Sequence, residues 1–245
     1  LKTTIMTTLA RITIAFILAL FLSSCAFDIN FGDGKKGNGV IAEDQRELTE
    51  EFTVVSAQEG LDVYITQAKD FEITVEADEN VIDLIGTDIR DGKLKIHAIE
   101  NIGRATKKVY VSLPDITGLE SSSGADLIGK NVIESDKISL KATSGSDLEV
   151  ELSADEVSAN TSSGADIKLS GEANMLNVKA SSGSDIKARD FIVQTCHADA
   201  SSGADISVNV SENLIADASS GGDISYTGDA TVQMKKSVSG SVHKN

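Results

Sequence analysis

The 245-residue chain contains no tryptophan, a single proline at position 114 and only 4% aromatic residues. A core built on large aromatic side chains is therefore excluded, and stacked Ile, Leu, Val, Ala and Ser side chains fit the composition better. Basic residues are also scarce: 22 Lys and Arg stand against 38 Asp and Glu, for a net charge of −16. Nucleic-acid binding needs a basic surface, so that class of function is excluded.

Cysteine is almost absent, and the two that occur have different settings. An apolar run over residues 12–22, too short for a comfortable membrane span, follows two basic residues and precedes Leu22-Ser23-Ser24-Cys25. This is the layout of an export signal, and its last four residues resemble a bacterial lipoprotein box. We therefore predict a lipoprotein signal peptide over residues 1–24 and lipid attachment at Cys25. An ordinary signal peptide with an incidental cysteine is the alternative.

Residues 25–39, which begin at Cys25, are rich in Gly, Asp, Asn and Lys, which is typical of a flexible tether. With Cys25 lipidated, Cys196 has no partner for an intramolecular disulfide. Because Cys196 falls in register with Leu176 and Leu214 of neighbouring repeats, we expect it to be a small buried apolar residue.

A short phrase, Ser-Gly-x-Asp followed by Leu or Ile, recurs through the second half of the chain. The steps between successive copies are 21, 19, 19, 20, 18 and 18 residues, counting a degenerate last copy. A fixed turn phrase with a period near twenty predicts a solenoid in which each repeat buries its apolar face against the next. The apolar residues that close the phrase are Leu127, Leu148, Ile167, Ile186, Ile206, Ile224 and, in the degenerate copy, Val242.

Strict alternation within each repeat predicts extended strands with one inward and one outward face. In one repeat the inward set is Leu176, Val178, Ala180, Ser182, Ser184 and Ile186, and Ser202 and Ser220 occupy the place of Ser182 in later repeats. Small inward residues imply a narrow interior, and the glycines mark a bend or a close backbone approach. The opposite parity places a column of aspartates outside, at Asp126, Asp147, Asp166, Asp185, Asp205 and Asp223.

Residues 40–245 are predicted to form a single β-helix domain. Residues 40–113 alternate in the manner of strands without the repeat phrase, so they form either less regular N-terminal coils or a separate cap. Asp91-Gly92 is a turn signal, and residues 78–84 favour one short helical turn. Regular coils occupy 114–245, and the last one, where Ser241 replaces the aspartate, is expected to cap the open end.

The aspartate column is the one repeated ionisable feature. Calcium favours several carboxylate and carbonyl oxygens together, so the six aspartates are candidate calcium ligands, although no metal site is predicted with them. Each aspartate also follows a glycine, and the alternative is a structural role in which it accepts backbone hydrogen bonds in the turn. His97, His197 and His243 have no serine and acid at a spacing that would form a catalytic triad. No catalytic residue and no cofactor is therefore predicted, and the protein is expected not to be an enzyme.

The chain resembles the auto-transporter adhesin, head GIN domain family over residues 48–245. The resemblance rests on the Ser-Gly-x-Asp-Ile repeats, on residues 109–114 (Val-Tyr-Val-Ser-Leu-Pro) and on residues 221–228 (Gly-Gly-Asp-Ile-Ser-Tyr-Thr-Gly). Members of that family are mostly exported or lipid-anchored proteins of Bacteroidetes. The resemblance implies an all-β, right-handed parallel β-helix with coils of about 20 residues, and it brings no catalytic residues.

Together these features predict a non-enzymatic protein of the cell envelope, exported and lipid-anchored, with the outer membrane as the expected location. Its partners would be the membrane, through the anchor, and a glycan or protein ligand on the outer face of the helix. Adhesion, surface binding and scaffolding are the expected roles. A carbohydrate-active β-helix enzyme and an envelope sensor that binds another protein are the alternatives.

Overall fold

The structure is a computed structural model that describes residues 34–235 and 239–245. The predicted signal peptide, Cys25 and the first residues of the predicted tether lie outside the described part. The described residues form a compact unit that begins at Lys35 and consists of β-strands with one short 3-10 turn, η1 (Ile82–Leu84). Within the described ranges there is no helix long and apolar enough to cross a membrane.

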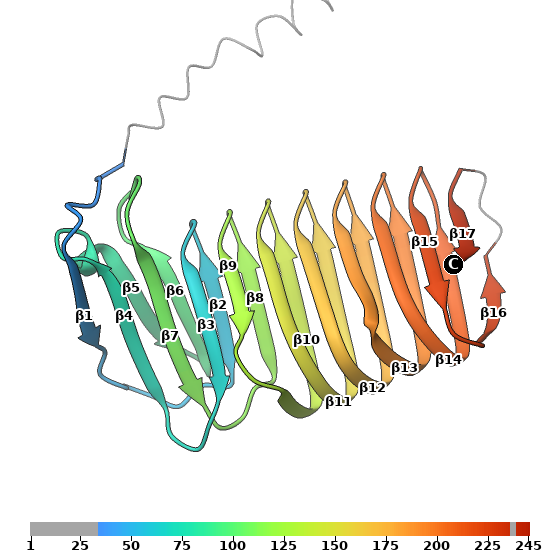
Figure 1. Ribbon diagram of the computed structural model, residues 1–245, viewed down its shortest axis with the longest axis horizontal. Coiled ribbons are helices and arrows are strands. Elements are labelled where there is room, and N and C mark those ends of the chain that lie inside the picture. Colours follow the sequence, from blue (N-terminus) through green and yellow to red (C-terminus); the bar gives the residue numbers. More distant parts are fainter. Residues whose placement is uncertain (1–33, 236–238) are drawn as a thin grey trace, which may run out of the picture. The chain divides into compact units, whose positions relative to one another are not determined.

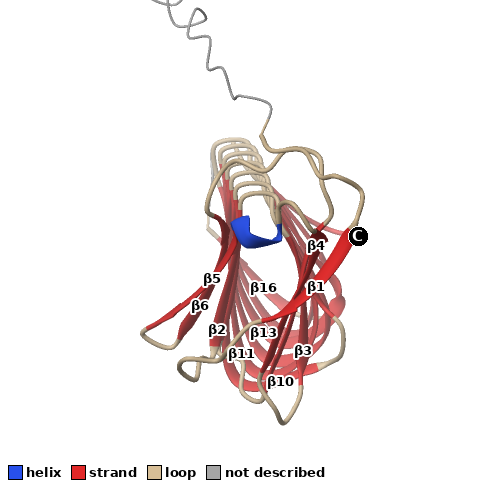
Figure 2. Ribbon diagram, turned by 90° about the vertical axis from the view of Figure 1, so that its left-hand side faces the viewer, coloured by secondary structure: helices blue, strands red, loops and turns tan. Residues whose placement is uncertain are grey.

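The regular half of the unit is a β-solenoid in which long strands stack in parallel (Figure 1). Strands β11 to β14 each start at a sharp turn, run along one wall, bend, and return along the opposite wall, as Figure 2 shows end-on, whereas β10 starts at the bend. The wall that contains the Asp-Ile segments is called the Asp wall below. The long strands are β10 (Ile133–Thr143), β11 (Asp147–Ser162), β12 (Asp166–Ser181), β13 (Asp185–Ser201) and β14 (Asp205–Ala218). The predicted all-β parallel β-helix is confirmed.

The first half builds coils in an order that differs from the sequence. Strand β2 (Val54–Gln58) lies between β6 (Lys93–Ala98) and β8 (Gly118–Ser122), parallel to both. Strand β3 (Asp62–Gln67) lies likewise between β7 (Lys107–Leu113) and β9 (Asp126–Gly129). The coil made by β6 and β7 is therefore farther from the regular repeats than the coil made by β2 and β3.

Antiparallel strands complete the N-terminal end. Strand β4 (Glu72–Asp78) pairs with β7, β1 (Ile41–Gln45) pairs with β4, and β5 (Ile85–Arg90) pairs with β6. Residues 40–113 thus supply both irregular coils and an antiparallel end, the two alternatives that the sequence left open. At the other end, the last coils are formed by β15 (Asp223–Thr227), β16 (Thr231–Met234) and β17 (Ser241–Lys244).

Residues 35–39, assigned to the tether from composition, instead pack against the domain. The Lys35 amide donates to the Asn101 carbonyl at 2.9 Å, and the Gly37 amide donates to the Arg104 carbonyl at 3.0 Å. Composition gave the wrong result here because backbone hydrogen bonds hold a glycine-rich segment without any contribution from its side chains.

The interior follows the predicted alternation along both walls. Ile167, Ile186 and Ile206 stack in register and are at most 1% exposed. Cys196 lies in register with Leu176 and Leu214 and is fully buried, as predicted. Its burial raises the pKa of the thiol to about 12. The thiolate is therefore absent at physiological pH, and Cys196 is a packing residue.

The turns between the walls depart from the alternation. Ser182, Ser202 and Ser220 were expected to point inward, and this prediction is wrong because all three are exposed. Each has a left-handed φ between 49° and 57°, and the glycine that follows has φ between 65° and 79°. Two successive residues with positive φ form a type I′ turn, closed in three of the repeats by i to i+3 hydrogen bonds at Ala125, Ala204 and Gly222. The strict two-residue period holds only in extended chain, so it fails across each turn.

Gly222 occupies a place where the preceding coils carry alanine or serine, as in Ser184 and Ala204. A Cβ atom added at Gly222 would lie 2.4 Å from the Ala200 carbonyl oxygen. We therefore expect Gly222→Ala to destabilise the protein by about 1–3 kcal/mol, although the repeat pattern alone would predict that alanine is tolerated. Thermal unfolding measures the effect, with Ala204→Ser as the matched control. Equal melting temperatures for Gly222→Ala and the wild type would contradict the tight approach.

Candidate functional site

The predicted aspartate column lies on the outer face of the Asp wall, next to the sharp turns. The six aspartates are in direct register from β9 to β15, and the structure adds a seventh, Asp62 on β3, in register with Asp126. Neighbouring strands are about 4.8 Å apart, so the carboxylates form a continuous line. The echo of the repeat phrase in Gly60-Leu61-Asp62-Val63 was the signal that could have placed Asp62 in this column.

Two members of the column, Asp126 and Asp205, have raised pKa values. Partial burial, together with the carboxylates of Asp147 and Asp62, raises the pKa of Asp126. Partial burial, together with Asp185 and Asp223, raises the pKa of Asp205. In both cases the ionised form is disfavoured because the group loses hydration and faces charges of its own sign.

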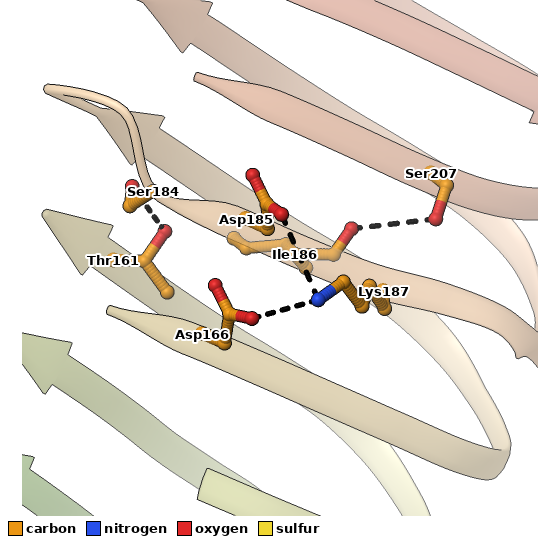
Figure 3. Close-up of polar contacts among 7 residues, drawn as sticks. All are labelled: Thr161, Asp166, Ser184, Asp185, Ile186, Lys187 and Ser207. Carbon is orange, nitrogen blue, oxygen red and sulfur yellow. Dashed lines mark hydrogen bonds and ion pairs between the residues drawn. The ribbon is translucent and has the colours of Figure 1, made fainter. Parts of the chain in front are cut away.

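Cations from the next outward column, two residues further along each strand, offset part of this repulsion. The Lys187 Nζ atom lies 2.7 Å from Asp166 Oδ2 and 3.6 Å from Asp185 Oδ2 (Figure 3). The hydrogen bond to Asp166 is the main reason why the pKa of Lys187 is raised. The imidazole Nδ1 of His243 lies 3.2 Å from Asp223 Oδ1 and would offset charge there only when the ring is protonated. Among the described residues, no ion pair reaches Asp126, Asp147 or Asp205.

The aspartates lie along a line, which is not the arrangement that a calcium site needs. Within residues 34–235 and 239–245, no three His, Cys, Asp or Glu side chains are grouped closely enough to hold a metal ion. Calcium takes six to eight oxygen ligands around one point, whereas the aspartates succeed one another along a line. The geometry therefore offers an extended acidic edge and no chelating cluster.

Replacing Asp205 by Asn is expected to raise the melting temperature at pH 8 by about 1–3 °C, because it removes the middle charge of three. The folded pKa of Asp205 lies above the ordinary value of 3.8, so its destabilising effect is present at neutral pH. The effect disappears as the pH falls through the folded pKa toward 3.8, and salt reduces it through screening.

Melting curves between pH 4.5 and 8, at low and high salt, test this expectation. Asp115→Asn, an exposed carboxylate outside the column, is the control for a general loss of negative charge. An equal rise for both variants, or a rise for Asp205→Asn that is unchanged at pH 4.5, would contradict a local repulsion within the column.

Two larger hollows open on the surface of the solenoid. One, of about 500 Å³, lies over the C-terminal coils of the Asp wall, where Ser207 and Ser225 leave room between Lys187 and His243. The other, of about 520 Å³, lies where the long strands bend and is lined by several carboxylates, including Glu134, Asp155 and Glu172. Side-chain amides connect neighbouring strands within this second hollow: Asn174 donates to Asp155 at 2.9 Å, and Gln194 donates to Asn174 at 3.1 Å.

The histidines lie apart from one another. His97 Nε2 is 2.8 Å from Asp88 Oδ2, and this hydrogen bond is the main cause of the lowered pKa of Asp88. His197 is exposed on the opposite wall, in register with Asn177 and Ile215. His243 lies in register with Ser225, and both residues line the hollow over the C-terminal coils together with Asp223.

Sequence reasoning missed an aromatic pair on the Asp wall. Tyr64 on β3 and Tyr110 on β7 are in register and stack with ring centroids 5.1 Å apart and an interplanar angle of 19°. Both belong to the same outward column as Lys187 and His243. The outer face of the Asp wall therefore changes from aromatic at the N-terminal end to charged in the regular coils.

Comparison with known proteins gives a family and a set of similar folds. The family model described as "Putative auto-transporter adhesin, head GIN domain" matches residues 51–230. A search of curated proteins found no match. A crystal structure of a putative adhesin from Bacteroides fragilis is similar, with a TM-score of 0.78 and 18% identity, over 86% of this chain and 100% of that one.

Two structures from Parabacteroides are also similar. A putative adhesin from Parabacteroides merdae has a TM-score of 0.69 and 18% identity, over 87% of this chain and 100% of that one. A protein from Parabacteroides distasonis described as a putative lipid binding protein has a TM-score of 0.71 and 19% identity, over 86% of this chain and 98% of that one. At these identities the likeness shows a shared fold.

Proposed function

Because the chain belongs to the family described as putative auto-transporter adhesins with a head GIN domain, we propose that it is a non-enzymatic binding module of the bacterial cell envelope. It is exported and held at the outer membrane by a lipid on Cys25, and it binds a glycan or protein through the outer face of the Asp wall. The observation that carries the proposal is the register of this face, which repeats the same side chains in coil after coil.

A repeating surface favours many weak contacts over one deep pocket. Asp126, Asp147 and Asp166 project from successive strands, so a partner with its own repeat can bind several coils at once. Simultaneous contacts raise the apparent affinity through effective concentration without any single strong site. Such distributed binding suits an adhesin or a scaffold.

A non-enzymatic role agrees with the state of the ionisable groups on the Asp wall. Hydrolysis of a glycoside needs two carboxyl groups placed across a bound sugar, one of them able to donate a proton. Here Lys187 lies within 4 Å of two carboxylates of the column, at 2.7 Å from Asp166 and 3.6 Å from Asp185. A lipid-binding role, which the name of one structural neighbour suggests, would need an apolar cavity. The described hollows all have charged or polar side chains in their linings.

Binding of the full chain, immobilised on fluorescent beads, to an array of glycans and matrix proteins tests the proposal. The array is run with calcium and again with a chelator, and beads that carry the core variant Ile186→Asp serve as the control. Capture by wild-type beads alone supports an adhesin, and loss of capture in chelator assigns a cation to the interaction. Absence of capture under both conditions contradicts the proposal, and release of sugar fragments from the array would indicate an enzyme.

A further inference from the structure

The aromatic pair on the Asp wall ends at a surface hollow. On one side of the pair, the Lys130 ammonium lies 5.3 Å from the centroid of the Tyr64 ring, so this end of the stack is covered. On the other side, the residue in register with Tyr110 is Thr74 of β4, whose side chain is small. The face of Tyr110 that is turned away from Tyr64 therefore borders open space, and Tyr110 is 38% exposed.

The hollow has a volume of about 230 Å³ and a polar lining around the single tyrosine ring. It lies over the antiparallel strands β1, β4 and β7 and the end of β3. The residues that line it are Glu43, Thr66, Glu72, Thr74, Tyr110, Val111 and Ser112. One aromatic ring is thus combined with three hydroxyl groups and two carboxylates.

Hydrogen bonds and stacking fix the position of the ring. The Tyr110 hydroxyl donates to Glu76 Oε2 at 3.3 Å, and Glu76 Oε1 also accepts from Lys108 Nζ at 2.9 Å. Together with Tyr64 on its other face, these contacts hold Tyr110 in one orientation before any ligand arrives. A ligand that packs on the ring therefore has little side-chain freedom to remove, which favours binding.

From this geometry we propose that the hollow beside Tyr110 binds one pyranose residue of a glycan that carries no acidic group. This proposal rests on the adhesin function proposed above and names its ligand. A pyranose has C–H groups on one face, which pack on the electron-rich face of an aromatic ring. Its hydroxyl groups donate to carboxylates and exchange hydrogen bonds with Thr and Ser hydroxyls.

The charge of the hollow selects among sugars. Glu72 already accepts one hydrogen bond from Thr74 at 3.3 Å, but a carboxylate has about four acceptor positions, so several remain for a ligand. Glu43 and Glu72 line the hollow with negative charge, whereas Glu76, at the ring hydroxyl, is paired with Lys108. Sugars with a carboxylate, such as uronic or sialic acids, would be repelled, so the site discriminates in favour of neutral sugars.

The test compares the full chain with Tyr110→Ala and Tyr110→Phe on an array of neutral and acidic glycans. Tyr110→Ala is expected to weaken binding to neutral glycans by about tenfold, and Tyr110→Phe by less, because phenylalanine keeps the ring face. His197→Ala, which removes an exposed ring from the opposite wall, is expected to bind as the wild type does. Unchanged melting temperatures show that the variants are folded.

Three results would overturn the proposal. If Tyr110→Ala binds neutral glycans as tightly as the wild type, the glycan binds elsewhere on the protein, and the adhesin function is not contradicted. A wild-type chain that binds only acidic glycans, or only matrix proteins, contradicts the selectivity and the ligand class while still supporting an adhesin. A wild-type chain that binds nothing on the array contradicts both proposals.

Discussion

Replacing Ile186 by Asp is expected to unfold the solenoid. Ile186 is 1% exposed and lies in the inward stack between Ile167 and Ile206, with neighbouring coils on both sides. An aspartate there would have to be ionised without a partner or protonated at a cost, and either state costs several kcal/mol. Since a domain is stable by only about 5–15 kcal/mol, most of its stability would be lost. Far-ultraviolet circular dichroism and thermal unfolding measure the result.

The matched control is Ile192→Asp, the same exchange at an isoleucine that is 56% exposed on the neighbouring part of β13. We expect this variant to melt within a few degrees of the wild type, because surface exchanges usually change stability by about 0.5 kcal/mol or less. If Ile186→Asp kept the spectrum and melting temperature of the wild type, the inward parity of the Asp wall would be wrong.

The regular coils could be predicted because each repeat has the same pattern of apolar and polar residues. The two-residue alternation placed Ile186 inside and Asp185 outside, and the period near twenty placed equivalent residues on neighbouring strands. The same reasoning gave the wrong orientation for the serines in the turns. Ser182 carries the parity of the buried set, but its left-handed φ of 57° puts it in a turn, where side chains do not alternate. A Ser-Gly pair between two extended runs was the signal for that turn.

The order of the first coils could not be read from the sequence. Strands β2 and β3 precede β6 and β7 in the chain, yet they lie between those strands and the regular coils. No repeat phrase marks the pairing, and strands of similar alternation can pair in several orders. Here the choice depends on tertiary packing, including the antiparallel strands that cover the end.

The candidate sites also differ in how far the sequence could predict them. The aspartate column followed from the repeat, whereas the stacked pair of Tyr64 and Tyr110 depends on the register of β3 with β7. The segments Asp62-Val63-Tyr64-Ile65 and Lys108-Val109-Tyr110-Val111 share an alternating pattern with tyrosine at the same place. That likeness was a signal that the two strands are neighbours, and it would have predicted the pair. The hollow itself required the position of Thr74 on β4, which no local pattern shows.

Replacing Asp78 by Ala is expected to release the segment that leads into the domain. Asp78 is 3% exposed, and its carboxylate accepts hydrogen bonds from the backbone amides of Gly39 and, at 2.7 Å, Thr106. The first amide belongs to the entering segment and the second to the loop before β7, so one side chain joins them. Alanine would leave both amides without this acceptor, at a cost of about 3–5 kcal/mol for two bonds to a charged group.

The loss should be confined to the N-terminal end of the domain. Residues 35–39 are also held by backbone bonds of Lys35 and Gly37 to the loop around Asn101 and Arg104. The Asn80 side chain donates to the Lys36 carbonyl at 2.8 Å and accepts from the Asn38 amide at 3.0 Å. Hydrogen exchange of Asp78→Ala is therefore expected to accelerate at Gly39 and Thr106 and to leave the amides of β12 and β13 nearly unchanged. Asp83→Ala, which removes an exposed carboxylate five residues away, is the control and is expected to exchange as the wild type does.

This result matters for anchoring because the chain upstream of the domain enters it through residues 35–39. If Cys25 carries the lipid, any pull between membrane and bound ligand passes along this segment, and Asp78 joins it to the strands that support Tyr110. Asp78→Ala beads should then retain glycan binding at rest but detach from an array under flow at lower shear than wild-type beads. Equal detachment, or equal hydrogen exchange at Gly39, would show that the other bonds of the segment, those of Lys35, Gly37 and Asn80, hold it without Asp78.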